Sequence, residues 1–183
     1  MRFTKLVIPD VVLVESPVLE DGRGFFLESY HKQQFLAAGL KDEFVQDNHS
    51  RSRQGSLRGL HYQIRQPQGK LVRVVVGEAY DVAVDLRRRS PTFGRWLGVH
   101  LSSDTKSQVW IPPGFAHGFY VLSDWAEVLY KTTDYYAPEW ERTLVWNDPT
   151  LQIGWPLLAA QPIPLLSEKD AAGRLFLEAE TYP

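Results

Sequence analysis

The sequence contains no cysteine. This absence excludes a disulfide framework, a thiolate-bound metal and a cysteine nucleophile. It is compatible with a reducing compartment. The first ten residues, MRFTKLVIPD, are interrupted by Lys5 and Pro9 before the apolar core of a signal peptide develops. We therefore expect a cytoplasmic protein.

Long apolar runs and a strong charge imbalance are also missing. No segment approaches the ~18 consecutive apolar residues that a membrane span requires. The net charge of -2 provides no general attraction for nucleic acid. We therefore predict no membrane and no nucleic-acid partner. An anionic ligand would have to be bound by local arginines and lysines.

Closely spaced turn signals along the 183 residues separate short runs rich in Val, Leu, Tyr and Phe. This pattern is typical of an all-β sandwich or barrel, and the length suits a single domain over residues 1–183. The segment 70–87, KLVRVVVGEAYDVAVDLR, alternates with period two, so that Asp81 and Asp85 share one face. The dipeptide Gly77-Glu78 is predicted to join two antiparallel strands in this segment.

A few short helices complete the expected fold. Residues 31–40, HKQQFLAAGL, combine helix formers with a glycine near the end. The segment SEKD, which begins at Ser167, resembles a capped first turn. Between them, the prolines clustered over residues 156–164 indicate an extended tail that wraps around the domain.

The segment 110–119, WIPPGFAHGF, resembles the second motif of cupin-type jelly rolls, in which a tight turn precedes an inward histidine. Many cupins bind a metal with a histidine at the position that corresponds to His117, together with a His-x-His pair from an earlier strand. The corresponding earlier segment here is His61-Tyr62-Gln63, and no His-x-His occurs anywhere. Because most catalytic metal sites need three protein ligands, the pattern argues against a metal site.

Four residues stand out as candidates for chemistry. His61 lies in the mixed polar and apolar run LRGLHYQ, Lys70 begins the apolar strand KLVRVVV, and Tyr130 lies beside apolar Val128. A small barrel that holds a ligand in its mouth would produce such mixed faces. Each of these three also has a simpler interpretation: His61 as a buried histidine with one hydrogen bond, Lys70 as a strand-end lysine and Tyr130 as a core tyrosine. The fourth candidate is Asp170 in SEKD, for which the simpler interpretation is an exposed carboxylate at a helix start.

Two further segments suit an anionic ligand. Arg23 stands between two glycines in DGRGFFLESY, where the backbone can approach a ligand closely. The segment 46–59, QDNHSRSRQGSLRG, concentrates guanidinium and amide groups, which suit a phosphate and a base edge. For Arg51 and Arg53 we favour the simpler interpretation of a solvated polar loop.

Nine segments, taken together, closely resemble the dTDP-4-dehydrorhamnose 3,5-epimerase family. In order from residue 21 to residue 170 they are DGRGFFLESY, FVQDNHSRS, LRGLHYQ, QGKLVRV, DVAVDLRRRSPTFG, WIPPGFAHGF, YKTTDYYAPE, WNDP and LLSEKD. The resemblance implies a cupin-type jelly roll (double-stranded β-helix) and a homodimer with no metal or organic cofactor. It also implies that the substrate is a dTDP-4-keto-6-deoxyhexose, namely dTDP-4-dehydro-6-deoxy-D-glucose. The reaction would invert C3 and C5 of this sugar and give dTDP-4-dehydro-L-rhamnose, a step of dTDP-L-rhamnose biosynthesis.

The resemblance also assigns roles. It implies that His61 is the base, that Asp170 fixes its imidazole, that Lys70 stabilises the enolate and that Tyr130 returns the proton from the other face. The implied substrate-binding residues are Arg23, Phe26, Glu28, Gln46, Asp47, Asn48, Arg58, His117, Tyr136, Glu141 and Lys169. Among them, Arg23 and Arg58 would contact the diphosphate. Glu28 and the 46–48 run would contact the nucleoside, and Tyr136 would stack on thymine. We also expect Asp81 to orient Lys70.

Three alternative functions remain open from the sequence. A related epimerase could invert a single carbon, although the presence of Tyr130 favours double inversion. A metal-dependent cupin, such as a dioxygenase or isomerase, would need stoichiometric metal for turnover. A binding module without catalysis would not need the complete set of four candidate catalytic residues.

Overall fold

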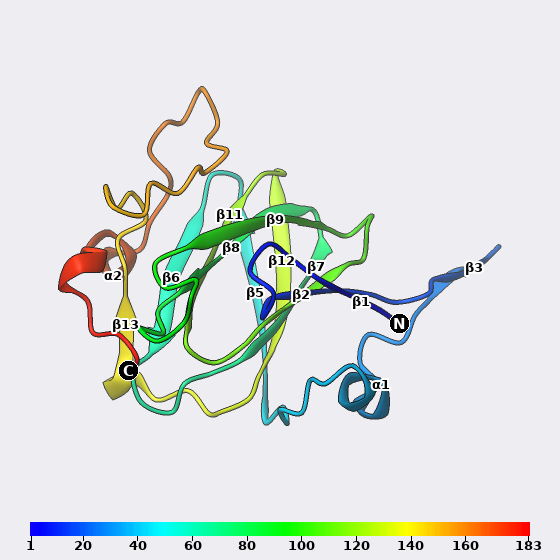
Figure 1. The fold of residues 1–183 in the computed structure, drawn as a ribbon. Helices are drawn as coiled ribbons and strands as arrows, with labels where there is room; N and C mark the ends of the chain where they lie inside the picture. The colour runs from blue at the N-terminus through cyan, green and yellow to red at the C-terminus, as the bar shows by residue number, and fades with distance from the viewer.

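Two antiparallel sheets pack face to face in the computed structural model, which describes residues 1–183 (Figure 1). The six-stranded sheet has the order β1 (Arg2–Lys5), β2 (Val12–Glu15), β10 (Gln108–Ile111), β7 (Lys70–Val76), β12 (Trp125–Thr132) and β5 (Gln46–Arg53). The five-stranded sheet has the order β13 (Glu141–Thr143), β6 (Leu57–Gln63), β11 (Phe115–Val121), β8 (Glu78–Asp85) and β9 (Trp96–Ser102). The predicted all-β jelly roll with a few short helices is confirmed.

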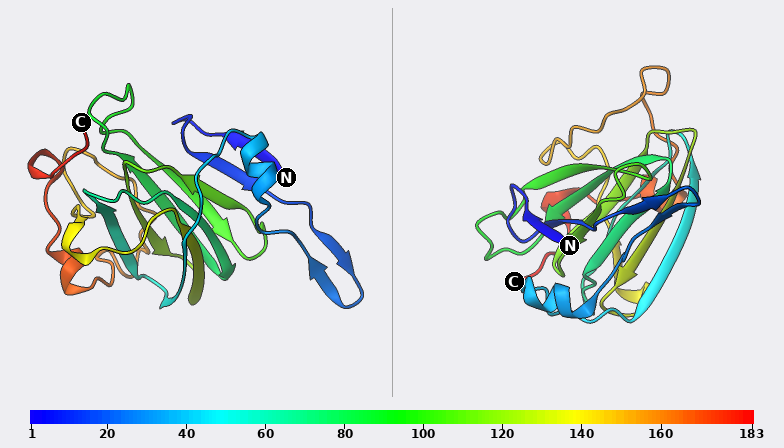
Figure 2. Two further views of the ribbon diagram at one scale, coloured as in Figure 1. Left: turned by 90° about the horizontal axis from the view of Figure 1, so that it is seen from below. Right: turned by 90° about the vertical axis from the view of Figure 1, so that its right-hand side faces the viewer.

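The remaining elements are short. A third, two-stranded sheet pairs β3 (Leu19–Asp21) with β4 (Gly24–Phe26) and projects away from the body as an arm (Figures 1 and 2). The predicted helices are present as α1 (Lys32–Ala37) and α2 (Glu168–Ala171), the latter capped by Ser167 as expected. Two 3-10 turns span Pro138–Trp140 and Phe176–Glu178. No helix has the length and apolarity needed to cross a bilayer.

The predicted pairing of the two strands around Gly77 is wrong. Strand β7 pairs with β10 and β12 in one sheet, whereas β8 pairs with β11 and β9 in the other. Gly77 has a φ of +73°, and a Cβ there would lie 2.0 Å from the Trp125 carbonyl oxygen. The glycine therefore lets the chain turn tightly beside another strand and cross between the sheets.

The five-stranded sheet is covered on both faces, and this explains the nearly continuous burial of its strands β8 and β11. Its inner face, with Ala79 and Phe115, packs against residues such as Val72 from the six-stranded sheet. Its outer face packs against Trp155 and Phe176 of the C-terminal segment. Of the predicted wrapped tail over residues 156–164, Leu157 and Leu158 pack against this face, whereas residues 159–163 are mostly exposed. The chain then brings α2 to the open end of the sandwich, next to β6 (Figure 1).

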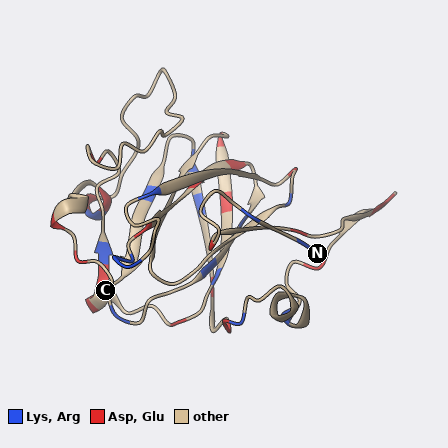
Figure 3. Cartoon of the chain, in the orientation of Figure 1, with Lys and Arg blue, Asp and Glu red and all other residues tan.

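Charged residues of both signs are interspersed along the chain (Figure 3). Some surface charges are paired within the chain, for example Lys131 with Asp47 and Lys32 with Glu43. With a net charge of only -2, attraction of an anion depends on cationic groups gathered at one place. That place is the cavity between the two sheets.

Candidate functional site

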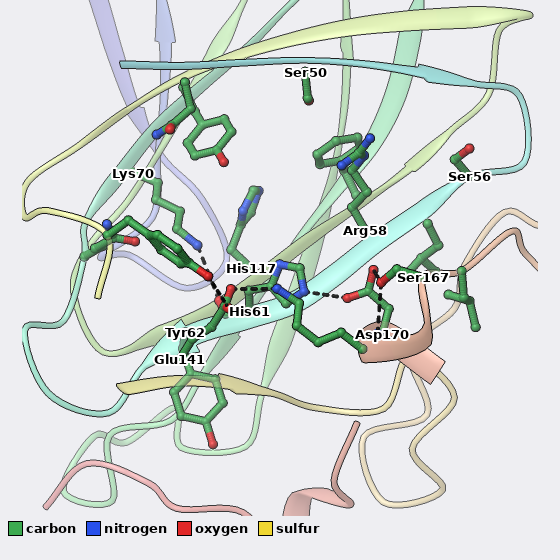
Figure 4. Close-up of a pocket in the computed structure, with 18 of the residues that line it drawn as sticks. Ser50, Ser56, Arg58, His61, Tyr62, Lys70, His117, Glu141, Ser167 and Asp170 are labelled. Atoms are coloured by element: carbon green, nitrogen blue, oxygen red, sulfur yellow. Dashed lines mark hydrogen bonds and ion pairs between the residues drawn. The ribbon is translucent and has the colours of Figure 1, made fainter. Parts of the chain in front are cut away.

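A cavity of about 570 Å³ opens between the two sheets at the end where α2 lies. The strands β5, β6, β7, β11, β12 and β13 all contribute side chains to it, and so does α2 (Figure 4). Of the predicted site residues it brings together His61, Tyr130, Lys70, Asp170, Gln46, Asn48, Arg58, His117, Tyr136, Glu141 and Lys169. A volume of this size is within the range of small-molecule sites.

His61 and Asp170 form a short hydrogen bond, with 2.5 Å between Nε2 and Oδ1 (Figure 4). The carboxylate is almost completely buried and also accepts a hydrogen bond from the Ser167 hydroxyl at 2.8 Å. Burial alone would raise the pKa of Asp170, but the hydrogen bonds from His61 and Ser167 outweigh it and lower that pKa. The carboxylate is therefore charged at neutral pH. It fixes the imidazole through Nε2 and leaves Nδ1 to exchange a proton.

Lys70, the first residue of β7, is buried without a carboxylate partner. Its Nζ donates one hydrogen bond, to the His61 carbonyl oxygen at 3.4 Å. Burial lowers the pKa of Lys70 to about 8, although the charges of Asp81 and Glu141 oppose this shift. An ammonium has three donors. Lys70 is therefore charged at pH 7 and keeps donors free for an anionic ligand.

A second histidine–carboxylate pair lies deeper, between β8 and β11. His117 Nε2 and Asp81 Oδ2 are 2.8 Å apart, and both side chains are buried. Burial lowers the pKa of His117, while the charge of Asp81 opposes that change. The hydrogen bond of Asp81 thus goes to His117, and the expected orientation of Lys70 by Asp81 stays a prediction that rests on charge alone.

Tyr130 and Arg58 also line the cavity. Tyr130 lies on β12 opposite Asn48 and Val72, and burial raises the pKa of its hydroxyl. The phenol is therefore protonated at neutral pH and is able to donate a proton. The Nε of Arg58 donates to the Ser52 hydroxyl at 2.8 Å, which holds the guanidinium in place and leaves its terminal nitrogens available.

Tyr136 stands at the mouth of the cavity and is held from several sides. Its hydroxyl donates to Glu141 Oε2 at 2.8 Å, and Lys169 Nζ donates to Glu141 Oε1 at 2.9 Å. Its backbone N–H donates to Gln46 Oε1 at 3.0 Å. The ring is still about half exposed, so one aromatic face remains available for a flat group.

Four of the predicted binding residues do not line this cavity within one chain. Arg23, Phe26 and Glu28 belong to the arm or follow it, and the Arg23 side chain is 91% exposed and paired only with Asp21 (Figure 2). Asp47 points to the outer face of β5 and pairs with Lys131 at 2.8 Å. The alternation of β5 explains this, because Gln46 and Asn48 point inward.

Several cavity residues were missed by the sequence reasoning. Ser50, Phe119 and Gln63 line the cavity, and the Ser50 hydroxyl is buried without a hydrogen-bond partner. Alternation from Asn48 would have indicated Ser50, and alternation from His117 would have indicated Phe119. Residues 1–183 contain no cluster of three or more histidine, aspartate or glutamate side chains placed to hold a metal ion.

A comparison with protein families gives a match over residues 5–178 to the model described as dTDP-4-dehydrorhamnose 3,5-epimerase. The chain belongs to the dTDP-4-dehydrorhamnose 3,5-epimerase family. It is therefore an isomerase of the dTDP-rhamnose pathway with a cupin-type β-fold. A Pseudomonas aeruginosa protein of that name is 62% identical over 184 residues, which cover 100% of both chains.

Solved structures of epimerases superpose closely on this chain. A Legionella pneumophila dTDP-6-deoxy-D-glucose-3,5-epimerase in complex with dTDP-4-keto-L-rhamnose has a TM-score of 0.94 and 50% identity, covering 98% of this chain and 94% of that one. A 3'-monoepimerase from Streptomyces bikiniensis in complex with dTDP-quinovose has a TM-score of 0.86 and 34% identity, covering 94% and 86%. The fold is thus shared by epimerases that differ in the number of carbons they invert.

Proposed function

We propose that the protein inverts C3 and C5 of dTDP-4-dehydro-6-deoxy-D-glucose, giving dTDP-4-dehydro-L-rhamnose, with its own side chains as the only catalytic groups. One observation carries this proposal: a fixed histidine, an unpaired buried ammonium and a protonated phenol meet in one cavity. A hydrogen on a carbon beside a ketone is acidic because the resulting anion delocalises onto the carbonyl oxygen. Inversion then needs a base, a charge at that oxygen and an acid on the opposite face.

His61 acts as the base in this proposal. The C–H bond breaks, the proton moves to Nδ1, and the electron pair passes to the C4 oxygen as an enolate. Asp170 holds Nε2 at 2.5 Å and stabilises the imidazolium that forms. The same base serves C3 and C5 when the sugar presents each carbon in turn.

Lys70 stabilises the enolate through its charge. Its single long hydrogen bond leaves the ammonium free to turn toward the C4 oxygen. Removal of a comparable oxyanion donor from other enzymes costs roughly 3–4 kcal/mol of transition-state stabilisation. The low polarity that depresses its pKa also strengthens this interaction.

Tyr130 completes the inversion by donating its proton to the opposite face of the enolate carbon. The phenolate regains a proton and the imidazolium loses one through solvent, so no net proton is gained or lost. Arg58 binds the diphosphate, Tyr136 stacks on thymine, and Gln46 with Asn48 contacts the nucleoside. His117, Glu141 and Lys169 complete the pocket.

The arm suggests how Arg23, Phe26 and Glu28 take part. An isolated two-stranded hairpin is marginally stable in water, and Leu19, Phe25 and Phe26 are all exposed on it. In a cytoplasmic homodimer, each arm would reach the cavity of the other subunit and place Arg23 beside the diphosphate. Light scattering should then give twice 21.0 kDa.

A mixing experiment tests this arrangement. His61→Asn subunits lack the base, and Arg23→Ala subunits lack the arm cation. If arms act between subunits, a mixed dimer contains one site with His61 from one chain and Arg23 from the other, and that site should have wild-type KM. If each arm served its own chain, the mixture would show only the raised KM of the Arg23→Ala protein.

The activity itself is tested with dTDP-4-keto-6-deoxyglucose and a coupled reductase that accepts only the rhamnose configuration. The proposal expects turnover without added metal and with chelator present. His61→Asn should abolish turnover while dTDP binding stays near normal. Product inverted at a single carbon would instead assign the protein to the monoepimerases, and equal loss of binding and turnover would give His61 a structural role.

A further inference from the structure

The loop over residues 133–137, which carries Tyr136 to the cavity mouth, is fastened by side-chain amides. Gln63 Nε2 donates to the Tyr135 carbonyl oxygen at 3.2 Å, and its Oε1 accepts from the Ala137 N–H at 2.8 Å. Gln68 Nε2 donates to the Asp134 carbonyl oxygen at 2.9 Å. The loop leaves β12 at Thr132 and has no strand pairing of its own over these residues. Gln63 therefore holds the backbone on both sides of Tyr136.

Gln63 also connects this loop to the catalytic strand. It is the last residue of β6, two residues beyond His61, and only 3% of its surface is exposed. Its Nε2 donates a second hydrogen bond, to the Gln66 carbonyl oxygen at 2.8 Å. All of its polar atoms are thus engaged with backbone groups, and none is needed for a reacting atom.

We propose that Gln63 is a positioning residue for nucleobase binding, which acts by holding the 133–137 loop so that Tyr136 faces the thymine ring. This inference rests on the proposed function, because it takes Tyr136 as the stacking partner of the base. It adds that the affinity for the base, and not the proton transfer, depends on an amide at position 63. The strand that carries the base His61 therefore also sets where the nucleotide lies.

The chemistry of the amide explains why glutamine is suited to this position. The two N–H groups of the Gln63 amide donate to two backbone carbonyl oxygens, and its Oε1 accepts from a backbone N–H. A glutamate of the same shape would place an oxygen against both carbonyls, and a methionine would satisfy none of the three groups. Either change leaves buried backbone groups unpaired, which favours a displaced loop.

The test compares dTDP with inorganic pyrophosphate, which lacks the base. Binding of each is measured by calorimetry for the wild type and for Gln63→Met, with Gln63→Glu as a second variant and thermal melting as the check of folding. We expect both variants to bind dTDP about tenfold more weakly, within the range of one lost base–aromatic stack. Pyrophosphate affinity in Gln63→Met and kcat at saturating substrate should stay within about twofold of wild type.

Gln54→Glu is the matched control. Gln54 Nε2 also donates to a backbone carbonyl, that of Leu122 at 2.7 Å, and Gln54 does not line the cavity. Its replacement should leave both affinities unchanged. In a Tyr136→Ala background, Gln63→Met should weaken dTDP binding no further, because the group that it positions is already missing.

The outcomes separate the inference from the proposed function. Wild-type protein that turns over the nucleotide sugar, with dTDP affinity unchanged in Gln63→Met, would overturn the role of Gln63 alone. Equal loss of dTDP and pyrophosphate binding, or an additive loss on top of Tyr136→Ala, would also overturn it. Wild-type protein that shows no turnover and binds dTDP no better than pyrophosphate would contradict the proposed function and the inference together.

Discussion

Replacement of Lys70 by methionine should make the protein more stable and much less active. The pKa of Lys70 is about 8 in the folded chain, against an ordinary value of 10.5. That difference corresponds to roughly 3 kcal/mol of preference for the neutral amine. At pH 7 the ammonium nevertheless prevails, so the native state carries this unfavourable burial. Methionine has a similar stem and no charge, so Lys70→Met should raise the free energy of unfolding by up to about 3 kcal/mol.

The stability difference should depend on pH in a defined direction. Between pH 8 and pH 10.5 the unfolded chain holds the lysine proton more tightly than the folded chain. The contribution of Lys70 to the wild-type free energy of unfolding therefore rises with pH across that interval, and Lys70→Met lacks this increase. The advantage of the variant should be largest below pH 8 and should disappear toward pH 10.5. Urea titrations at pH 7 and at about pH 10 measure it.

The Lys70→Met variant should lose activity although it gains stability. Without the ammonium the enolate loses its charge partner, so kcat should fall by about 10²–10³-fold. Lys41→Met, at an exposed lysine, is the control and should change neither stability nor activity measurably. A Lys70→Met protein that is less stable than wild type at pH 7, or that keeps kcat within about threefold of wild type, would refute this reasoning.

Three further predictions concern the same site. In wild type, kcat/KM should fall as the pH rises through about 8, because Lys70 loses its proton there; a pH–rate profile checks this, and Lys70→Met should lack that limb. Asp170→Asn should lower kcat at least about a hundredfold, because the variant no longer fixes the His61 imidazole. The dTDP dissociation constant should stay within about twofold of wild type, because Asp170 has no contact with the nucleotide in this proposal. Tyr130→Phe should exchange sugar protons with deuterium oxide but invert at least about a hundredfold more slowly, because only the acid on the second face is missing; proton NMR separates exchange from inversion.

Local patterns in the sequence predicted the elements well. The period-two alternation of residues 70–87 placed Asp81 and Asp85 on one face of a strand without specifying which face is buried. In the structure the face of β8 that carries Asp81 and Ala83 is the inner one. The pairing around Gly77 failed because alternation specifies faces and does not specify which sheet a strand joins. The strand pairings of the structure show that the chain changes sheets at Gly77.

The candidate site depended on contacts that no local pattern encodes. Asp170 lies 109 residues after His61, and the wrapped tail alone brings them within 2.5 Å. In isolation, the SEKD segment favoured an exposed carboxylate, and the resemblance to the epimerase family supplied the pairing with His61. Asp47 shows the converse: the resemblance assigned it to the nucleoside, whereas alternation along β5 would have indicated that it points away from Asn48.

The central claim is that one cavity takes protons from both carbons beside the ketone and returns them on the other face. The most direct test incubates wild type and His61→Asn with dTDP-4-keto-6-deoxyglucose in deuterium oxide and follows the sugar by proton NMR. The account predicts loss of both the C3 and the C5 proton signals with wild type and of neither with His61→Asn. Exchange at C3 alone, or exchange that persists without His61, would contradict it.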